Sequence, residues 1–158
     1  ETGEPIPAEL LEKVIRASRF NQGFDTLEYL AAAILDLEWH TLAPEEIPED
    51  IEAFEAATLK KYGVDVSAVP PRYRTPYFAH IWGGGYAASY YAYLWSEVLA
   101  ADAFAWMQST GGATRANGDH LRNEVLSRGS SRDPMESYKA FRGQEPTVDA
   151  LLMRRGLK

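Results

Sequence analysis

The sequence predicts an all-α protein, and three observations support this prediction. Apolar residues recur at intervals of three and four along most of the chain, which is the spacing of one helix face. The period-two alternation of a half-buried strand is nearly absent. Glycine and proline fall between the helical stretches. We find no internal repeat and expect residues 1–158 to form a single helical segment.

Two helices are predicted in the first part of the chain. The apolar stripe of the first helix consists of Leu10, Leu11, Val14 and Ile15. We expect this helix to end at residues 21–23, where a glycine can adopt the left-handed conformation that follows many helices. Asp25 and Glu28 have the spacing of a capping box, so the second helix is predicted to start there and to run to about Thr41.

The remaining helices are each bounded by glycine or proline. We expect them at residues 51–62, 87–108, 114–128, 134–142 and 148–154. Residues 70–76 are rich in proline and are predicted to be extended, because proline lacks a donor and disfavours helix in the residue before it. Residues 77–82 suit either an extended chain or one helical turn.

Composition argues against several classes of protein. The chain has 158 residues, of which 46% are hydrophobic and 25% charged, as in an ordinary folded domain rather than a disordered one. The net charge of −7 argues against nucleic acid as a partner, because phosphate binding needs a basic surface. No apolar run approaches the roughly 18 residues of a membrane span, so no membrane partner is expected. The absence of cysteine permits a cytoplasmic location, which we expect.

The most informative segment lies between His80 and Tyr93 and is unusually rich in tyrosine. If a helix begins at the glycines, Tyr86 and Tyr93 lie two turns apart on one face, together with Tyr90. The simpler interpretation is amphipathic packing of the tyrosines around a structural histidine. Three consecutive glycines at residues 83–85 indicate a close backbone approach or a hinge, because each costs conformational entropy on folding.

Residues 77–95 read YFAHIWGGGYAASYYAYLW, and this string resembles the C-terminal region of the thimet-oligopeptidase-like zinc metallopeptidases. The three glycines between His80 and Tyr86 favour the bacterial peptidyl-dipeptidase (dipeptidyl carboxypeptidase) branch over the oligopeptidases. Shorter matching segments lie at residues 20–24, 28–32, 127–129 and 154–157, so the resemblance covers nearly the whole chain.

The resemblance implies a fold, an activity and a set of site residues. The fold is the helical C-terminal part of a clamshell zincin-type peptidase catalytic domain, with a deep channel that admits peptides. The activity is the release of dipeptides from the C-terminus of oligopeptides. Catalysis is assigned to His80, Tyr86 and Tyr93, whose positions match the family motif. Substrate binding is assigned to His80, Gly83, Gly84, Gly85, Tyr86, Tyr90 and Tyr93.

The resemblance also implies a zinc ion bound by an H-E-x-x-H helix and a later glutamate, and this chain lacks that motif. Its histidines are His40, His80 and His120, and no two are four residues apart. We therefore expect no metal ligand here, with the zinc held by a missing N-terminal part of the same enzyme. The isolated chain is expected to be inactive and, because severing a domain exposes apolar surface, to self-associate as a dimer.

Two alternatives stay open. In the first, the protein belongs to the same family but is an endo-acting oligopeptidase. The second is a standalone, non-catalytic helical module that binds peptides or a partner subunit.

Overall fold

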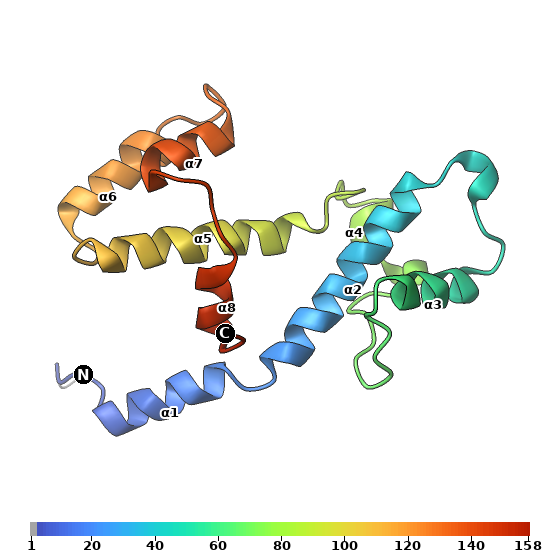
Figure 1. Cartoon of the computed structure of the whole chain (residues 1–158), viewed down its shortest axis with the longest axis horizontal. Helices are drawn as coiled ribbons and strands as arrows, with labels where there is room; N and C mark the ends of the chain where they lie inside the picture. The colour runs from blue at the N-terminus through green and yellow to red at the C-terminus, as the bar shows by residue number, and fades with distance from the viewer. Residues whose placement is uncertain (1–2) are drawn as a thin grey trace. The chain divides into compact units, whose positions relative to one another are not determined.

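The computed structural model describes residues 3–158, and its regular elements are all helical, with no strand in that range (Figure 1). The all-α prediction is therefore confirmed. The chain divides into two compact units between Tyr93 and Leu94. None of the helices of the described residues is both long enough and apolar enough to cross a membrane.

The first unit contains one long helix of 20 residues, two helices of 11 residues and several short turns. In chain order, its elements are α1 (Ala8–Ser18), α2 (Gln22–Thr41), the 3₁₀ turn η1 (Pro44–Glu46), α3 (Ile51–Lys61), the 3₁₀ turn η2 (Thr75–Tyr77) and α4 (Ala79–Trp82). The stretch left open between extended chain and one helical turn is thus a 3₁₀ turn followed by a single α-helical turn.

The second unit is built on α5 (Ala92–Ser109), whose first two residues belong to the first unit. It continues with α6 (Arg115–Leu121), the π-helical turn η3 (Arg122–Leu126), α7 (Pro134–Arg142) and α8 (Asp149–Arg155). The predicted helix at residues 114–128 is therefore present as α6 and η3. In Figure 1, α6 and α7 lie on one side of α5, and α8 contacts α5 through a cluster of Leu151, Val98 and Ala101.

The capping box predicted at Asp25 is wrong. The helix α2 starts at Gln22, and its N-cap is Asn21 in the left-handed conformation, with φ of 56°. Asn21 tolerates this conformation better than most residues with a side chain. It therefore turns the chain directly from α1 into α2, and Asp25 lies inside the first turn of the new helix.

The helix predicted to begin at residue 87 begins instead at Ala92. Residues 86–91 form successive turns, with the N–H of Ser89 donating to the carbonyl of Tyr86 at 2.9 Å. Ala88 has φ of 53°, which is incompatible with a right-handed helix. The segment has two strong helix formers in Ala87 and Ala88 and no glycine or proline, so local sequence alone does not explain the turns.

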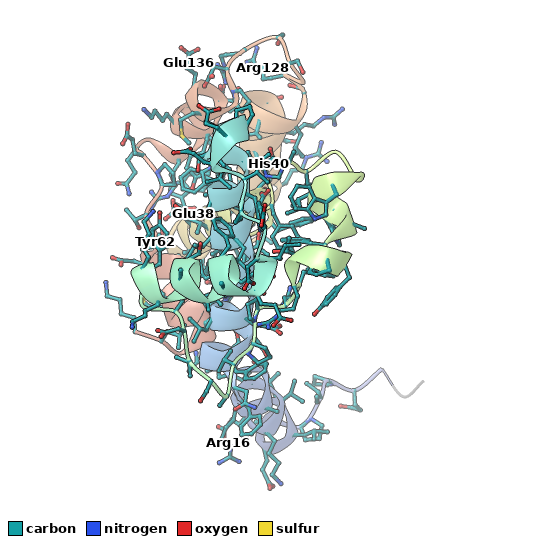
Figure 2. All side chains as sticks on the ribbon, turned by 90° about the vertical axis from the view of Figure 1, so that its right-hand side faces the viewer. Arg16, Glu38, His40, Tyr62, Arg128 and Glu136 are labelled. Carbon is teal, nitrogen blue, oxygen red and sulfur yellow. The ribbon has the colours of Figure 1, made fainter. Side chains whose placement is uncertain are left out.

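Helices α2 and α3 pack together through Ala31, Leu35 and Leu59, with Trp39 and Val64 against the edge of the cluster. Asp50 caps α3 by accepting a hydrogen bond from the N–H of Ala53 at 2.9 Å. At the exposed end of this pair, Glu38 of α2 accepts from Lys61 and from the hydroxyl of Tyr62 (Figure 2). These two donors lower the pKa of Glu38.

A buried carboxylate on α3 fixes the chain that leads to the tyrosine segment. Glu55 is 2% exposed, and it accepts from the N–H of Thr75 at 2.6 Å and from Arg74 at 3.0 Å. Thr75 in turn accepts two indole N–H groups, from Trp39 at its hydroxyl and from Trp82 at its carbonyl, both at 2.8 Å. Helix α4, which carries His80, is thereby tied to α2 and α3.

The second unit has a corresponding buried carboxylate in Asp102 on α5. It is 3% exposed and accepts from the hydroxyl of Tyr138 at 2.5 Å and from Arg142 at 2.9 Å. Burial, followed by the hydrogen bond to Asp102, raises the pKa of Tyr138 well above its ordinary value. This triad joins α5 to α7.

The glycine run forms a tight turn after α4. A Cβ atom added to Gly84 would lie 2.9 Å from both the Cα and the carbonyl oxygen of His80, whereas one added to Gly83 would meet nothing closer than 4.0 Å. Gly85 has φ of +80°. Of the two roles predicted for the run, the close backbone approach is therefore present, and Gly84 is the glycine that makes it.

Gly84→Ala should destabilise the protein, because the new methyl group collides with backbone atoms that cannot move aside. We expect the free energy of unfolding to fall by about 1–3 kcal/mol, as for other overpacked sites. Gly83→Ala is the matched control and should change it by less than about 1 kcal/mol. Urea denaturation of the two variants measures the difference, and equal unfolding midpoints would show that the turn does not depend on Gly84.

Candidate functional site

The residues assigned to the site all lie in the first unit, on α4, the glycine turn, the turns that follow and the first turn of α5. Their rings form one cluster. Tyr86 and Tyr93 stack with ring centroids 5.2 Å apart and 21° between their planes. His80 lies 6.2 Å from Tyr86 and 5.5 Å from Tyr90, and Tyr90 lies 5.3 Å from Tyr93.

The tyrosine pair comes together by a different route from the one predicted. On a continuous helix, residues seven apart are separated by about 10 Å along the axis. In the structure Tyr86 precedes the helix, and the reversal of the chain at Ala88 brings its ring back onto Tyr93. The two phenols are therefore in direct contact, which a shared helix face would not produce.

The members of the cluster differ in exposure. Tyr86 and Tyr93 are 37% and 45% exposed, so both rings can meet a ligand. Tyr90 is 4% exposed and is packed between Tyr29, 5.1 Å away, and Phe78, 4.8 Å away. Burial raises the pKa of Tyr90. Tyr90 therefore packs beneath the exposed pair. Almost none of its own surface is accessible to a substrate.

The pKa of the Tyr93 hydroxyl is raised, so this group keeps its proton over a wide pH range. The hydrogen bond to Tyr86, followed by burial, raises the pKa of Tyr93 to about 12. A phenol has an ordinary pKa of about 10 and is already protonated at neutral pH, so the shift extends the range over which Tyr93 stays a hydrogen-bond donor. Tyr93 therefore offers a hydroxyl donor that retains its proton.

The glycine amides are largely committed within the turn. Gly83 and Gly84 both donate their N–H groups to the carbonyl of Ala79, at 3.0 and 2.9 Å. Tyr86 donates its own N–H to the carbonyl of His80 at 3.1 Å, which closes the turn. The predicted substrate-binding glycines thus shape the backbone beside His80. Two of their three N–H groups are hydrogen-bonded within the turn and are not available to a substrate.

Three residues that the sequence does not mark as part of the site support the cluster. Tyr73 packs on His80 at 4.8 Å and stacks on Phe78 at 4.9 Å. The hydroxyl of Tyr29 on α2 donates to the carbonyl of Tyr90. Asp36, also on α2, is fully buried and accepts from the backbone of the turn. The sequence does contain a hint of the role of Asp36. It is the one charged residue between Glu28 and Glu38, in a helix rich in Ala and Leu, and a charged residue in such a position is often buried with a partner.

The two arginines near the site are already paired. Arg72 contacts Glu28 at 2.7 Å and lies over the ring of Tyr29, and Arg74 contacts the buried Glu55 at 3.0 Å. Both therefore have counter-ions within the first unit. Either would have to break an ion pair before binding a substrate carboxylate.

Chemically, the site combines two exposed phenol donors with an imidazole, an arrangement suited to hydrogen-bonding a polarised carbonyl oxygen. Across residues 3–158, no group of three or more His, Cys, Asp or Glu side chains is placed so that it could hold a metal ion. The residues present do not fit a zinc site.

Comparison with known proteins identifies the family. The sequence profile of Peptidase family M3 matches residues 1–157. The chain is 48% identical over 157 residues to the dipeptidyl carboxypeptidase of Salmonella typhimurium and 46% identical over 157 residues to that of Escherichia coli. It is 41% identical over 160 residues to Escherichia coli oligopeptidase A. These alignments cover 99–100% of this chain and 23% of each relative, so the chain spans about a quarter of their length.

The resemblance drawn from the tyrosine segment is therefore confirmed over the full length of the sequence. Its all-helical architecture and its match over residues 1–157 agree with each other. The chain belongs to peptidase family M3.

Proposed function

We propose that this chain is the C-terminal part of a zinc metallopeptidase that releases dipeptides from the C-terminus of oligopeptides. The observation that carries the proposal is the exposed, stacked pair of Tyr86 and Tyr93 beside His80. The identity of 46–48% to two dipeptidyl carboxypeptidases supports this specificity.

In this proposal the phenols act on the scissile peptide bond. As the carbonyl carbon becomes tetrahedral, negative charge develops on its oxygen, and a hydroxyl that remains protonated can donate to it. Tyr93 is suited to this role by its raised pKa, and Tyr86 holds it in place through the ring stack. His80, backed by Tyr73, is placed to donate to a neighbouring substrate carbonyl.

The zinc is proposed to be bound by residues outside this chain, because the described residues do not fit a metal site. When bound, it supplies the Lewis acid and the activated water of such peptidases. This chain then contributes hydrogen-bond donors and part of the wall of the substrate site. We propose that it has no hydrolytic activity by itself.

The proposed partners are peptide substrates and the remaining part of the same enzyme. Helix α1 supports the second partner, because the structure gives it no buried residue and its apolar stripe is open, with Leu10 50% and Val14 52% exposed. Such a stripe is ordinarily covered. In the isolated chain the same surface is proposed to drive self-association, and a cytoplasmic location remains part of the proposal.

The specificity can be tested from the products. The full-length protein should shorten a nonapeptide by successive dipeptides from its C-terminus, as seen by mass spectrometry of timed samples. A metal chelator should abolish cleavage, and residues 1–158 alone should leave the peptide intact. Internal fragments without dipeptides would indicate the endo-acting alternative, which the 41% identity to oligopeptidase A supports.

The role of Tyr93 can be tested separately. Tyr93→Phe in the full-length protein should lower kcat about 10²–10³-fold, as for the loss of an oxyanion donor, while the ring stack and KM change little. Tyr91→Phe is the matched control, because Tyr91 is 49% exposed and lies outside the cluster. Steady-state kinetics on the same nonapeptide give both constants. A Tyr93→Phe enzyme within threefold of the control would remove this hydroxyl from the mechanism.

A further inference from the structure

The carboxylate of Asp36 lies at the centre of the first unit and binds the turn that carries the tyrosines. Asp36 is 0% exposed. Its Oδ1 accepts from the N–H of Ala88, and its Oδ2 accepts from the N–H of Tyr90, both at 2.9 Å. Each oxygen thus holds one backbone amide from a segment more than fifty residues away. A buried carboxylate is costly unless it is hydrogen-bonded, and these two amides meet that need.

A third donor comes from the next turn of α2. The Nδ1 of His40 lies 2.9 Å from Oδ1 of Asp36 and 2.8 Å from the carbonyl oxygen of Asp36 (His40 is labelled in Figure 2). Both partners are acceptors, so this nitrogen carries the proton. The His40 ring also packs on Trp82 of α4 at 5.4 Å. Asp36 is therefore linked both to the turn and to the helix that carries His80.

The conformation held by Asp36 is one that Ala88 does not adopt readily. Ala88 has φ of +53°, and it is exposed, so no packing of its own side chain explains this conformation. Left-handed backbone is unfavourable for a residue with a Cβ and persists where surrounding contacts impose it. The hydrogen bond to the Ala88 N–H is such a contact.

The geometry of the tyrosine pair follows from this turn. Residues 87–91 contain no glycine or proline, so without the reversal at Ala88 nothing in their composition stops α5 from extending toward the glycines. Tyr86 and Tyr93 would then be separated by about two helical turns. With the reversal, their rings stack at 5.2 Å.

We propose that Asp36 is a positioning residue for the candidate active site: by binding the amides of Ala88 and Tyr90, it sets the turn that brings Tyr86 onto Tyr93. Its effect on catalysis rests on the proposed function, whereas its effect on the turn does not. Asp36 touches neither ring through its side-chain hydrogen bonds and acts through the backbone.

The test compares Asp36→Asn with Asp102→Asn in the full-length protein. The two carboxylates are similarly buried, at 0% and 3% exposure, but only Asp36 contacts the turn. Hydrogen exchange read by mass spectrometry reports the amides of residues 86–92, and steady-state kinetics on a nonapeptide report kcat and KM. Asp36→Asn should speed exchange in that segment at least about tenfold and lower kcat about 100-fold, the scale of an approximately 1 Å misplacement, with KM within threefold. Asp102→Asn should change neither.

A second pair of variants leaves the carboxylate intact, in case Asp36→Asn does not fold. Ala88→Val puts a β-branched side chain in the left-handed conformation, and Ala87→Val places the same side chain on the neighbouring exposed residue. Ala88→Val should reproduce the faster exchange and the loss of kcat, and Ala87→Val should reproduce neither.

Several outcomes would overturn the proposal. Unchanged exchange in both Asp36→Asn and Ala88→Val would show that the turn does not depend on this contact. Faster exchange with unchanged kcat would show that the turn does not position the tyrosines for catalysis. If the wild-type protein cleaves no peptide, the proposed function fails, and the exchange measurement still decides whether Asp36 holds the turn.

Discussion

The buried carboxylate of Asp36, with a backbone amide on each oxygen, is the interaction on which the rest of the site depends. It joins the C-terminal half of α2 to a turn far along the chain, at a point where the local sequence has no glycine or proline to break a helix. The turn determines where α5 begins and brings the two exposed phenols into contact. Breaking the contact would leave a buried acceptor without its donors, which is costly, so the contact is stable as well as directional.

A second buried carboxylate, that of Glu55, fixes the position of α4 in a similar way. Glu55 holds Thr75, and Thr75 receives the indoles of Trp39 and Trp82, so His80 is presented by a helix of only one turn. A single turn has little stability of its own, because helix nucleation is unfavourable. The site is therefore built on short, irregular segments held by polar contacts from α2 and α3.

The sequence predicted the regular helices well and the irregular segment less well. Helix α7 was expected at residues 134–142 and lies there, since Asp133 and Gly143 mark its ends locally. The start of α5 and the left-handed Ala88 could not be read from neighbouring residues, because Asp36, the group that imposes them, is 52 residues away. The four candidate rings, chosen from the tyrosine spacing and the resemblance, lie in one cluster, and their role in binding and catalysis stays a prediction. The burial of Tyr90 depends on Tyr29 and Phe78, which no spacing rule connects to it.

The role of the tyrosine pair is tested most directly by a crystal structure of the full-length protein with a phosphinic peptide. Such a peptide mimics the tetrahedral intermediate of peptide hydrolysis. We expect the hydroxyl of Tyr93 or Tyr86 at about 3 Å from a phosphinyl oxygen, with Asp36 still bound to the amides of Ala88 and Tyr90. A complex in which both hydroxyls point away from the phosphinyl group, or in which the turn has left Asp36, would contradict this expectation.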